Sequence, residues 1–291
     1  MRAAAILGLG CPSENLKPFQ RLGNVEWQLG LPASAEEADV ILLFGGDGTI
    51  HRHLNQLVRL GLPVLIIPSG SGNDFAQALG LRNVRDSLAA WIAFCNGAGE
   101  VRAIDLGVII QDAGGAPAPR THYFCSVAGI GLDGEVTRRA NRLPRWLRGH
   151  GGYVLSLAPA IFTYAPAIMK ITAEDHSGAW TVRSVRRTLL AAFANTSSFG
   201  DGMKIAPMAQ MDDGLLDVCV VGDVGPLRLL WLFPSVYSGA HLKLPEVQYF
   251  QAGRVRVESE RALDVYADGE YVCGTPVEFG LQREALKVIR L

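Results

Sequence analysis

Residues 41–49 read Ile-Leu-Leu-Phe-Gly-Gly-Asp-Gly-Thr, an apolar run that breaks into a glycine-rich turn. The run is short, uncharged and rich in β-formers, as expected of a buried parallel strand. Residues 50–60 then place apolar side chains on one face of a predicted helix. Glycines between a strand and a helix let backbone N–H groups approach a phosphate, which the helix N-terminus also attracts. The pattern predicts either a phosphate-binding turn or an ordinary connection of a doubly wound protein, with Asp47 near the N-cap.

Asp47 is the unusual member of this turn, because a carboxylate repels a phosphate. We expect its side chain to act on a metal ion, on a metal-bound water or on a substrate hydroxyl. Asp47 is therefore a candidate catalytic residue.

A second loop of the same kind follows the next predicted strand, residues 63–67. It reads Pro-Ser-Gly-Ser-Gly-Asn-Asp-Phe at residues 68–75. In open α/β sheets, ligands bind outside the carboxyl ends of the strands, where both loops are expected. Ser69 and Ser71 can donate to phosphate oxygens, and Asn73 can cap the helix or bind a ribose or base. A single such loop is usually a solvated turn, but two at adjacent strand ends favour a nucleotide site.

Further glycine- and acid-containing motifs follow in a fixed order. They are Phe-Cys-Ser-Val-Ala-Gly-Ile-Gly-Leu-Asp-Gly (124–134), Asn-Thr-Ser-Ser-Phe-Gly-Asp-Gly-Met-Lys-Ile-Ala-Pro (195–207), Met-Asp-Asp-Gly-Leu-Leu-Asp-Val (211–218) and Ala-Asp-Gly-Glu (267–270). With the two loops, they resemble the catalytic domain of the diacylglycerol kinase and sphingosine kinase family, from about Asp39 to the C-terminus. Gly-Gly-Asp-Gly alone also resembles NAD kinases and phosphofructokinases. The specific signal is the whole series in order.

The resemblance implies an α/β N-terminal domain with a parallel sheet, of the NAD kinase and diacylglycerol kinase type, and then a mainly antiparallel β-sandwich. We expect the first domain over residues 1–98 and the second over 99–283, with a segment from about 284 to 291 returning to the first. In the second domain the sequence predicts strands over 101–110, 121–127, 167–172, 188–194, 215–221 and 247–257, and helices over 133–140, 153–163 and 227–237. Residues 112–120 are expected to form a hairpin tip or a disordered loop.

The resemblance also implies which residues bind the nucleotide, ATP. They are Gly45, Gly46, Asp47, Gly48, Thr49, Gly70, Ser71, Asn73 and Asp105. Asp105 stands out on its own as well, because it interrupts an apolar strand in which an unpaired carboxylate is costly to bury. We expect Asp105 either to have a partner cation or to lie at a cleft.

Glu270 matches the residue regarded as the proton acceptor in bacterial members of the family. Asp268 would orient Glu270 or contact magnesium, and Gly269 permits a sharp turn in which both carboxylates point inward. Taken alone, Asp-Gly-Glu is also an ordinary hairpin turn. The resemblance implies a kinase that transfers the γ-phosphoryl group of ATP to a lipid hydroxyl, that of diacylglycerol or a related lipid.

Asp213 is the candidate metal ligand. The resemblance implies that Mg²⁺ is held by this side chain and by backbone carbonyls matching Gln210 and Leu215. Magnesium favours hard oxygen ligands and keeps several waters, so few protein ligands suffice. The alternative is a plain turn between two strands, because Asp-Asp-Gly is favourable turn chemistry.

The chain departs from the family pattern near its N-terminus. Members usually carry an Asn-Pro-x-Ser-Gly phosphate loop, which Leu-Gly-Cys-Pro-Ser at residues 9–13 lacks, and the first βαβ unit is short. Arg52 stands where a Glu is common, and Ser71 replaces a common Thr but keeps the hydroxyl. Two alternatives therefore remain: an NAD kinase-like enzyme with a soluble acceptor, and a catalytically silent nucleotide- or lipid-binding protein. Retention of the four acids (Asp47, Asp213, Asp268 and Glu270) favours the lipid kinase.

Composition restricts the other classes of function. The net charge of −1 gives no general basic field for nucleic acid. Five scattered cysteines without a Cys-x-x-Cys pair favour reduced thiols in the cytoplasm.

No signal peptide is evident. The uncharged segment 152–169 contains Pro159 and Pro166, so we predict a helix and a strand there and no transmembrane span.

A lipid kinase without a transmembrane span needs some surface that docks on the membrane. Residues Arg138–Arg148 hold five arginines around Leu143, Trp146 and Leu147. Such a segment can lie on an anionic membrane surface, which predicts transient peripheral association of a cytoplasmic protein. A solvated helix face and loop is an equally good interpretation.

Overall fold

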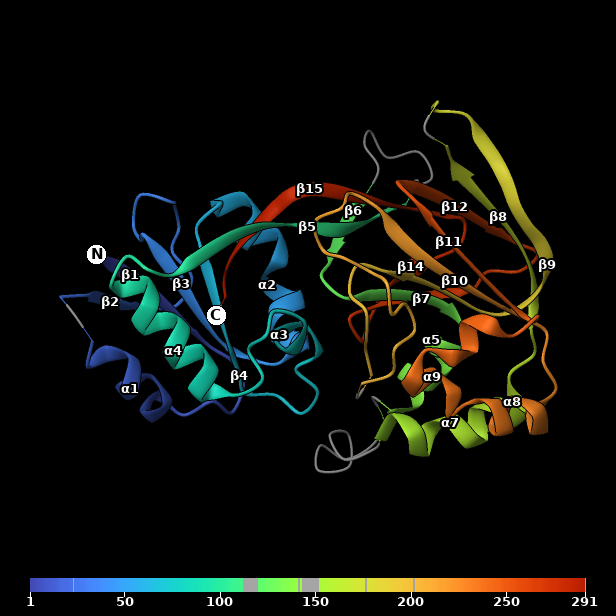
Figure 1. The fold of residues 1–291 in the computed structure, drawn as a ribbon, viewed down its shortest axis with the longest axis horizontal. Coiled ribbons are helices and arrows are strands. Elements are labelled where there is room, and N and C mark those ends of the chain that lie inside the picture. The colour runs from blue at the N-terminus through green and yellow to red at the C-terminus, as the bar shows by residue number, and fades with distance from the viewer. Residues whose placement is uncertain are drawn as a thin grey trace. The chain divides into compact units, whose positions relative to one another are not determined.

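The structure is a computed structural model that describes residues 1–22, 24–111, 120–140, 142, 152–175, 177–200 and 202–290, without the side chains of 152–155. The chain forms two compact units (Figure 1). Unit 1 consists of residues 1–105 and 283–291, and unit 2 of residues 106–282. Two long strands, β5 (Glu100–Gln111) and β15 (Val277–Arg290), contribute residues to both units.

Unit 1 is built on a parallel sheet in the order β2-β1-β3-β4, to which the end of β15 adds through a parallel pair between Val288 and Val64. Its elements are β1 (Arg2–Leu7), η1 (Ser13–Leu16), α1 (Lys17–Gln20), β2 (Glu26–Leu29), β3 (Val40–Gly45), α2 (Asp47–Leu60), β4 (Val64–Pro68), α3 (Asp74–Ala78) and α4 (Val84–Cys95). Among the described residues between β1 and β2, the only elements are η1 and the four-residue α1. The first connection is therefore short, as its sequence suggests.

Burial explains the elements that lead to the candidate site. Every residue of β3 and β4 is buried, so these apolar runs form the centre of the parallel sheet. Helix α2 packs against β3 with one apolar stripe, Ile50, Leu54, Leu57 and Leu60. It ends at Gly61, which adopts φ +62° and donates its N–H to the carbonyl of Leu57 at 3.0 Å.

Unit 2 is a mainly antiparallel β structure. Its strands are β6 (Arg120–Phe124), β7 (Val127–Gly131), β8 (Ala167–Glu174), β9 (Trp180–Ala194), β10 (Leu216–Gly222), β11 (Val247–Ala252), β12 (Arg254–Ser259), β13 (Asp264–Ala267) and β14 (Glu270–Gly274), with the first part of β15. The strand order β14-β13-β7-β9-β8-β12-β15 is joined by β10, which pairs with β9 and β11, and by β6, which pairs with β5. The core lies between layers, and the rings of Phe193 and Phe279 stack there with centroids 3.8 Å apart.

Several short helices flank the sheets of unit 2, along its lower edge in Figure 1. They are α5 (Leu132–Ala140), α7 (Gly152–Thr163), α8 (Pro226–Leu232), α9 (Ser235–Ser238) and the 3₁₀ turn η2 (Ala240–Lys243). They enclose a second apolar cluster, which includes Leu132, Val136 and Leu157. In the part of the chain that is described, no helix has the length and apolar character needed to cross a bilayer.

The predicted architecture of an α/β domain with a parallel sheet and an antiparallel β-sandwich is confirmed, with local differences that have clear causes. The strand predicted over 121–127 breaks after Phe124, because the next two N–H groups bond to the side chain of Asp268, in the turn between β13 and β14. The helix predicted over 227–237 is two helices separated at Pro234, which has no N–H to continue the first. The predicted hairpin tip falls on 112–119, outside the described residues, and β5 and β6 pair antiparallel on either side of it.

Candidate active site

In unit 1 the two glycine loops touch each other through their backbones. A Cβ atom built on Gly70 would lie 2.5 Å from the Cα of Gly46, and one built on Gly46 would lie 2.8 Å from the Cα of Gly70. The N–H of Ser69 also donates to the carbonyl of Gly45 at 3.1 Å. Any side chain at Gly46 or Gly70 would separate the loops, so the sequence needs glycine at both positions.

Asp47 is the first residue of α2 and joins the two loops through its carboxylate. Its Oδ2 accepts from the N–H of Asp74 and its Oδ1 from the N–H of Phe75, both at 3.1 Å. These N–H groups belong to the first turn of α3, so Asp47 caps one helix from the start of another. This positioning role is compatible with, but separate from, the catalytic role predicted from the sequence.

Asn73 shapes the second loop. It adopts the left-handed conformation, with φ +59°, and its side chain closes the loop on Gly70 by two hydrogen bonds of 2.8 Å. The side chain of Ser71 is exposed, whereas Ser69 donates its hydroxyl to the carbonyl of Ile67 at 3.3 Å. The loop therefore presents backbone groups and the Ser71 hydroxyl to solvent, which suits contact with an anion.

Asp105 lies where β5 leaves unit 1, and it is only 3% exposed. Its Oδ1 accepts from the N–H of Glu284 at 2.8 Å. Glu284 itself adopts φ +50°, so the carboxylate bonds to β15 at an irregular point of the strand. A backbone N–H is thus one of the groups that compensate the burial of Asp105.

In unit 2 the Asp-Gly-Glu turn between β13 and β14 separates two acids with different surroundings. Asp268 adopts φ +50° and Gly269 φ +84°. The carboxylate of Asp268 accepts from the N–H groups of Cys125 and Ser126, both at 2.9 Å. Glu270 is exposed, and no hydrogen bond or ion pair of its side chain is found within the described residues. Asp268 is therefore tied to the fold, whereas Glu270 projects a carboxylate that a substrate can reach.

Asn195 connects this turn to the central loop of unit 2. Its side chain is fully buried and donates to the carbonyl of Cys125 at 3.1 Å, and its N–H donates to the carbonyl of Ser126 at 2.8 Å. The segment that holds Asp268 is thus itself held by Asn195. Three motifs that lie far apart in the sequence, at 124–134, 195–207 and 267–270, meet here. Asp201 of the central motif lies outside the described residues.

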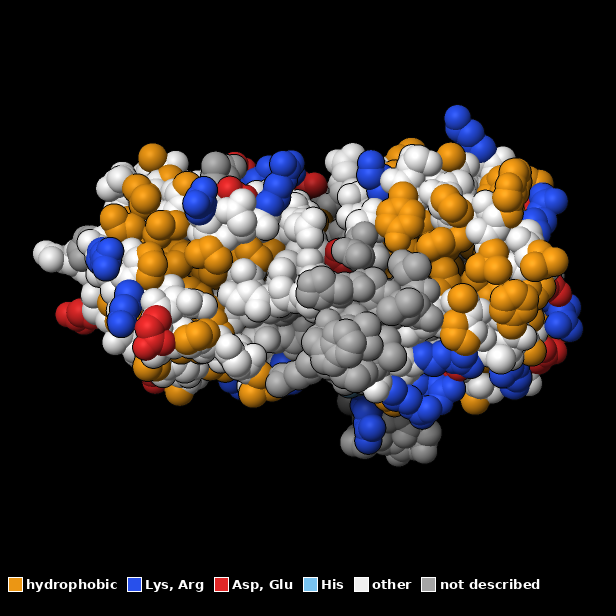
Figure 2. Space-filling view, turned by 90° about the horizontal axis from the view of Figure 1, so that it is seen from below, with side chains coloured by type: hydrophobic (Ala, Val, Ile, Leu, Met, Phe, Trp, Pro, Cys, Tyr) orange, Lys and Arg blue, Asp and Glu red, His pale blue; other side chains and the backbone are white. Residues whose placement is uncertain are grey.

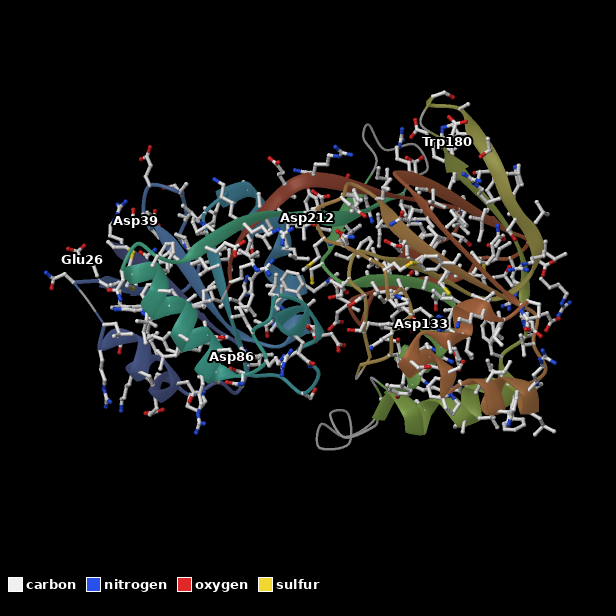
Figure 3. All side chains as sticks on the ribbon, in the orientation of Figure 1. Glu26, Asp39, Asp86, Asp133, Trp180 and Asp212 are labelled. Atoms are coloured by element: carbon white, nitrogen blue, oxygen red, sulfur yellow. The ribbon has the colours of Figure 1, made fainter. Side chains whose placement is uncertain are left out.

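The predicted metal ligand Asp213 lies in the turn before β10, next to Asp212, which is labelled in Figure 3. Its Oδ1 accepts from the N–H of Leu215 at 2.9 Å, and its Oδ2 is 3.5 Å from Nε2 of Gln251. The same Gln251 nitrogen lies 3.3 Å from Oδ2 of Asp217. The side-chain amide of Gln251 thus links the carboxylate of Asp213, in the turn, to that of Asp217, in β10.

Asp217 belongs to this group, although the sequence analysis did not single it out. Its side chain is fully buried and accepts a short hydrogen bond from the hydroxyl of Tyr249. Burial raises the pKa of Asp217, the hydrogen bonds from Tyr249 and Gln251 oppose this, and the charge of Asp213 adds to the rise. The detectable signal was a carboxylate in an apolar strand, the same signal that identified Asp105.

No three His, Cys, Asp or Glu side chains come together as a metal site in the described parts of the chain. The predicted site is of another kind, because it uses one carboxylate and the backbone carbonyls of Gln210 and Leu215. All of these donors are hard oxygens, which Mg²⁺ prefers. The proximity of Asp213 to the buried Asp217 concentrates negative charge at this turn, which also suits a cation.

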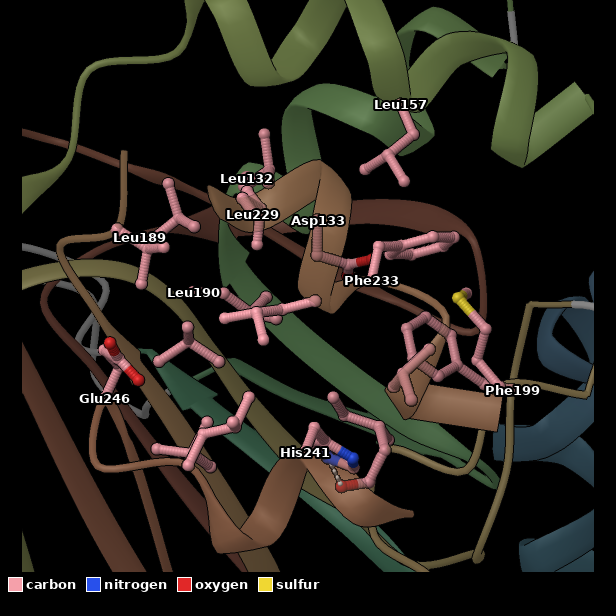
Figure 4. A pocket seen from close by; sticks show the side chains of 18 residues that line it. Leu132, Asp133, Leu157, Leu189, Leu190, Phe199, Leu229, Phe233, His241 and Glu246 are labelled. Carbon is pink, nitrogen blue, oxygen red and sulfur yellow. Dashed lines mark hydrogen bonds between the residues drawn. The ribbon is translucent and has the colours of Figure 1, made fainter. Parts of the chain in front are cut away.

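Unit 2 also contains an apolar cavity of about 100 Å³ beneath α8 (Figure 4). Most of its wall is aliphatic or aromatic, and the polar side chains that line it are Asp133, His241 and Glu246. Asp133 is 6% exposed, and in Figure 4 it lies beside Phe233. Burial lowers the pKa of His241, so its neutral form is favoured. The cavity therefore has a largely apolar wall that also contains the carboxylates of Asp133 and Glu246.

Comparison with known proteins agrees with this combination of a glycine-loop α/β unit and a β-sandwich that holds buried acids. Residues 28–109 match the family described as diacylglycerol kinase catalytic domain, and residues 126–290 match the YegS C-terminal NAD kinase beta sandwich-like domain. The chain therefore belongs to the diacylglycerol kinase and YegS-like family of bacterial lipid kinases, and the predicted resemblance is confirmed.

Individual relatives give the same result. The chain is 35% identical over 258 residues to a diacylglycerol kinase of Mycobacterium tuberculosis, covering 89% of this chain and 79% of the relative. It is 30% identical over 261 residues to a probable lipid kinase YegS-like protein of Chromohalobacter salexigens, covering 84% of this chain and 76% of the relative. A solved diacylglycerol kinase structure from Bacillus anthracis superposes with a TM-score of 0.66 at 19% identity, covering 100% of this chain and 96% of that one. At this identity the structure supports the fold alone.

Proposed function

We propose that this kinase transfers the γ-phosphoryl group of ATP to the hydroxyl of a lipid, with diacylglycerol or a related lipid as the acceptor. The observation that best supports a lipid as the acceptor is the apolar cavity of unit 2, whose wall includes the buried carboxylate of Asp133. An acyl chain is compatible with the aliphatic wall, and Asp133 can accept a hydrogen bond from a polar group of the lipid. A soluble acceptor such as NAD has no need of such a wall.

The nucleotide is assigned to the paired glycine loops of unit 1. The contact between Gly46 and Gly70 exposes backbone groups of both loops, and the Ser71 hydroxyl is accessible beside them. Phosphoryl transfer needs little covalent chemistry from the protein, so holding the phosphates in position is a large part of catalysis.

Glu270 is the proposed proton acceptor. Its carboxylate is exposed, and the neighbouring Asp268 fixes the turn from which it projects. In this proposal Glu270 takes the proton from the lipid hydroxyl as the hydroxyl oxygen bonds to the γ-phosphorus. The bond between that phosphorus and the β–γ bridging oxygen breaks, and ADP leaves. Asp268 then acts by positioning Glu270, because its own oxygens bond to two backbone N–H groups.

Magnesium is assigned to Asp213 and to the carbonyl oxygens of Gln210 and Leu215, with Gln251 and Asp217 behind them. When bound, the ion supplies positive charge that offsets the charge of the phosphates. The reaction takes place where ATP meets lipid, at the cytoplasmic face of a membrane.

A labelling experiment tests the proposal directly. Purified protein is incubated with γ-labelled ATP, magnesium and mixed micelles of diacylglycerol, and label is followed into the organic phase. We expect label in lipid, and we expect Glu270→Ala to lower the rate by roughly 10²–10⁴-fold with ATP binding retained. Glu258→Ala, at an exposed glutamate that pairs with Lys170, is the matched control and should keep its activity.

The outcomes separate the alternatives. Label in NAD but not in lipid would favour the soluble-acceptor kinase. ATP binding without transfer to any acceptor would favour a silent binding protein.

A variant in the cavity tests the acyl site separately. Val221 lines the cavity, so Val221→Phe should fill part of it and lower turnover of long-chain diacylglycerol more than turnover of a short-chain one. Val185→Phe, at a 61% exposed position on β9, provides the same substitution away from the cavity. Equal losses for both chain lengths in Val221→Phe would contradict the assignment of the cavity to the acyl chain.

A further inference from the structure

Helix α8 is largely apolar although it lies at the surface, and Arg228 is its one charged residue. Its sequence is Pro-Leu-Arg-Leu-Leu-Trp-Leu, and none of its seven residues is buried. Leu227 is 76% exposed and Trp231 is 80% exposed. They lie four residues apart and so share one face of the helix. A large apolar face of this kind at the surface marks an interaction site more often than a single exposed leucine does.

The other side of α8 forms part of the cavity wall. Leu229 and Leu232, together with the following Phe233, line the cavity. The same helix thus turns one apolar face to the cavity and another to solvent. Only the thickness of this short helix separates the proposed acyl site from the exposed face.

Helix α7 packs beside α8 and extends this surface. Phe162, near its C-terminus, is 58% exposed. We call the surface formed by Phe162, Leu227 and Trp231 the α7–α8 face. Figure 2 views the molecule from below, the side on which both helices lie, and shows hydrophobic side chains gathered over this part of unit 2 with Lys and Arg side chains along its rim.

Arginines surround the α7–α8 face. Three of them hold the chain at the end of α7: Arg139 donates to Oγ1 of Thr163 at 2.7 Å, Arg261 to the carbonyl of Ala165 at 2.6 Å and Arg187 to the carbonyl of Pro166 at 3.4 Å. Arg228 lies on α8 itself, with a side chain that is 56% exposed and that pairs with Glu246. Arg187 likewise pairs with Asp223. Arg138 and Arg139 share a single carboxylate, that of Glu135, so the ion pairs there leave positive charge in excess.

We propose that the α7–α8 face docks on an anionic lipid bilayer. This inference rests on the lipid kinase function proposed above. Trp231 and Leu227 would enter the boundary between head groups and acyl chains, and the arginines would lie at the level of the lipid phosphates. Indole is well suited to this boundary, since it combines a large apolar ring with an N–H donor.

The position of the face has a direct consequence for the substrate. Because α8 borders both the bilayer and the cavity, a diacylglycerol molecule reaches Asp133 without its acyl chains passing through water. Docking therefore serves both to bind the membrane and to deliver the acceptor. The basic segment predicted from the sequence contributes Arg138, Arg139 and Arg142 among the described residues, whereas Arg145 and Arg148 lie outside them.

Vesicle binding by the full chain tests the inference. Co-sedimentation is measured with phosphatidylcholine vesicles that contain phosphatidylglycerol, and with phosphatidylcholine alone. The test variant is Leu227→Ser/Trp231→Ser, and the control is Val182→Ser/Val185→Ser, which removes two exposed valines of β9 (58% and 61% exposed). We expect the partition coefficient on anionic vesicles to fall by roughly tenfold or more in the test variant. We expect the control to bind like the wild type.

A fluorescence measurement identifies the inserted residue. Vesicles with brominated acyl chains should quench the tryptophan emission of the wild type, and Trp231→Phe should lose most of that quenching while still binding the vesicles. Unchanged quenching in Trp231→Phe would overturn the insertion of this residue. Equal vesicle binding by the test variant and the wild type would overturn the α7–α8 face as the docking surface.

Two further readouts separate this inference from the proposed function. Turnover of a short-chain, monomeric diacylglycerol should be the same in the test variant and the wild type, because neither substituted residue lines the cavity. Absence of that turnover in the wild type would refute the proposed acceptor and leave vesicle binding as an independent result. Sedimentation velocity without vesicles provides the last outcome. If the wild type is a dimer and the test variant is a monomer, the α7–α8 face binds a second copy of the chain, and its assignment to the bilayer is overturned.

Discussion

Asp268 and Glu270 are two residues apart, yet their side chains have different surroundings. Asp268 uses both carboxylate oxygens to hold the N–H groups of Cys125 and Ser126. Asp268→Asn would turn an NH₂ group toward one of these donors. We expect a loss of about 1–3 kcal/mol in the free energy of unfolding, together with lower activity.

The comparison with Glu270→Ala makes this prediction specific. Glu270 is exposed, so its replacement should lower activity with little change in the urea midpoint. Urea unfolding and lipid labelling of both variants check the contrast. Equal stability of Asp268→Asn and the wild type would contradict the positioning role.

Asp217 should make stability depend on pH in an unusual direction. Burial raises its pKa in the folded protein, so the protonated form is favoured by folding. Its contribution to the free energy of unfolding is full below the pKa of an unfolded aspartate, about 3.9, and is lost as pH rises through the higher folded pKa. Asp217→Asn cannot ionise and lacks this dependence.

We therefore expect the wild type to lose stability relative to Asp217→Asn as pH rises from about 4 to 7. Urea unfolding of both proteins across this range measures the difference. Asp264→Asn, at an exposed aspartate of β13, controls for the removal of one carboxylate. A gain in stability of the wild type relative to Asp217→Asn as pH rises would contradict this and show that the Asp217 carboxylate is stabilised as an anion.

At the scale of elements, the close contact between the two glycine loops of unit 1 requires that Gly46 and Gly70 have no side chain. A Cβ on Gly70 would lie 2.5 Å from a backbone atom of Gly46, whereas a Cβ on Gly72 would lie 3.3 Å from a side-chain oxygen of Asp47. Gly70→Ala must therefore push β3 and β4 apart at their ends, and we expect it to lower stability by about 1–3 kcal/mol. It should also weaken ATP binding.

Gly72→Ala is the matched control, because it adds the same methyl group two residues away. We expect a much smaller effect, since only a side chain has to move. Thermal unfolding and isothermal titration with ATP measure both properties. Equal behaviour of the two variants would rule out the close approach of the loops as the reason for glycine at Gly70.

How well the sequence predicts these elements depends on whether the signal is local. The strand and turn at 41–49, the second loop and the strands around Asp213 follow from runs of apolar residues that end in glycine. Asp217, Tyr249 and Gln251 could not be grouped in advance, because β10 and β11 bring them together across some thirty residues. The capping of α3 by Asp47 is likewise a contact between separate elements, 27 residues apart.

The cavity could not be predicted from the sequence for the same reason. Its wall combines residues from α5, α7, β9, β10 and α8. Each of these leucines and valines also fits an ordinary core, and only their arrangement leaves space. The long uncharged segment at 152–169 was correctly divided into a helix and a strand, α7 and β8, which are separated by residues that include Pro166, whereas Pro159 lies within α7.

At the scale of the whole molecule, unit 1 is completed by the last strand of the chain. Leu286, Val288 and Ile289 are buried at the end of β15. Ile289→Ala should therefore destabilise unit 1 by roughly 2–5 kcal/mol, although the residue lies 184 positions after Asp105, where the first part of that unit ends. Lys287→Ala, at an exposed position of the same strand, should change stability by less than about 0.5 kcal/mol.

Calorimetry with and without ATP checks this prediction. ATP at about 100 times its Kd should stabilise the unit that binds it by about 2.7 kcal/mol. The Ile289→Ala protein should show a lower unfolding temperature for the transition that ATP shifts. A change confined to a transition that ATP does not shift would place Ile289 in the other unit.

The discontinuity of unit 1 also has a consequence for synthesis. Translation proceeds from the N-terminus, so a ribosome finishes the first 105 residues of unit 1 long before it makes residues 283–291. The glycine loops at 45–49 and 68–75, where the nucleotide is proposed to bind, therefore leave the ribosome in a sheet that still lacks residues 283–291. A nascent chain interrupted anywhere in unit 2 would carry both loops without those residues. Nucleotide binding at the proposed site would therefore begin only after residues 283–291 have been made.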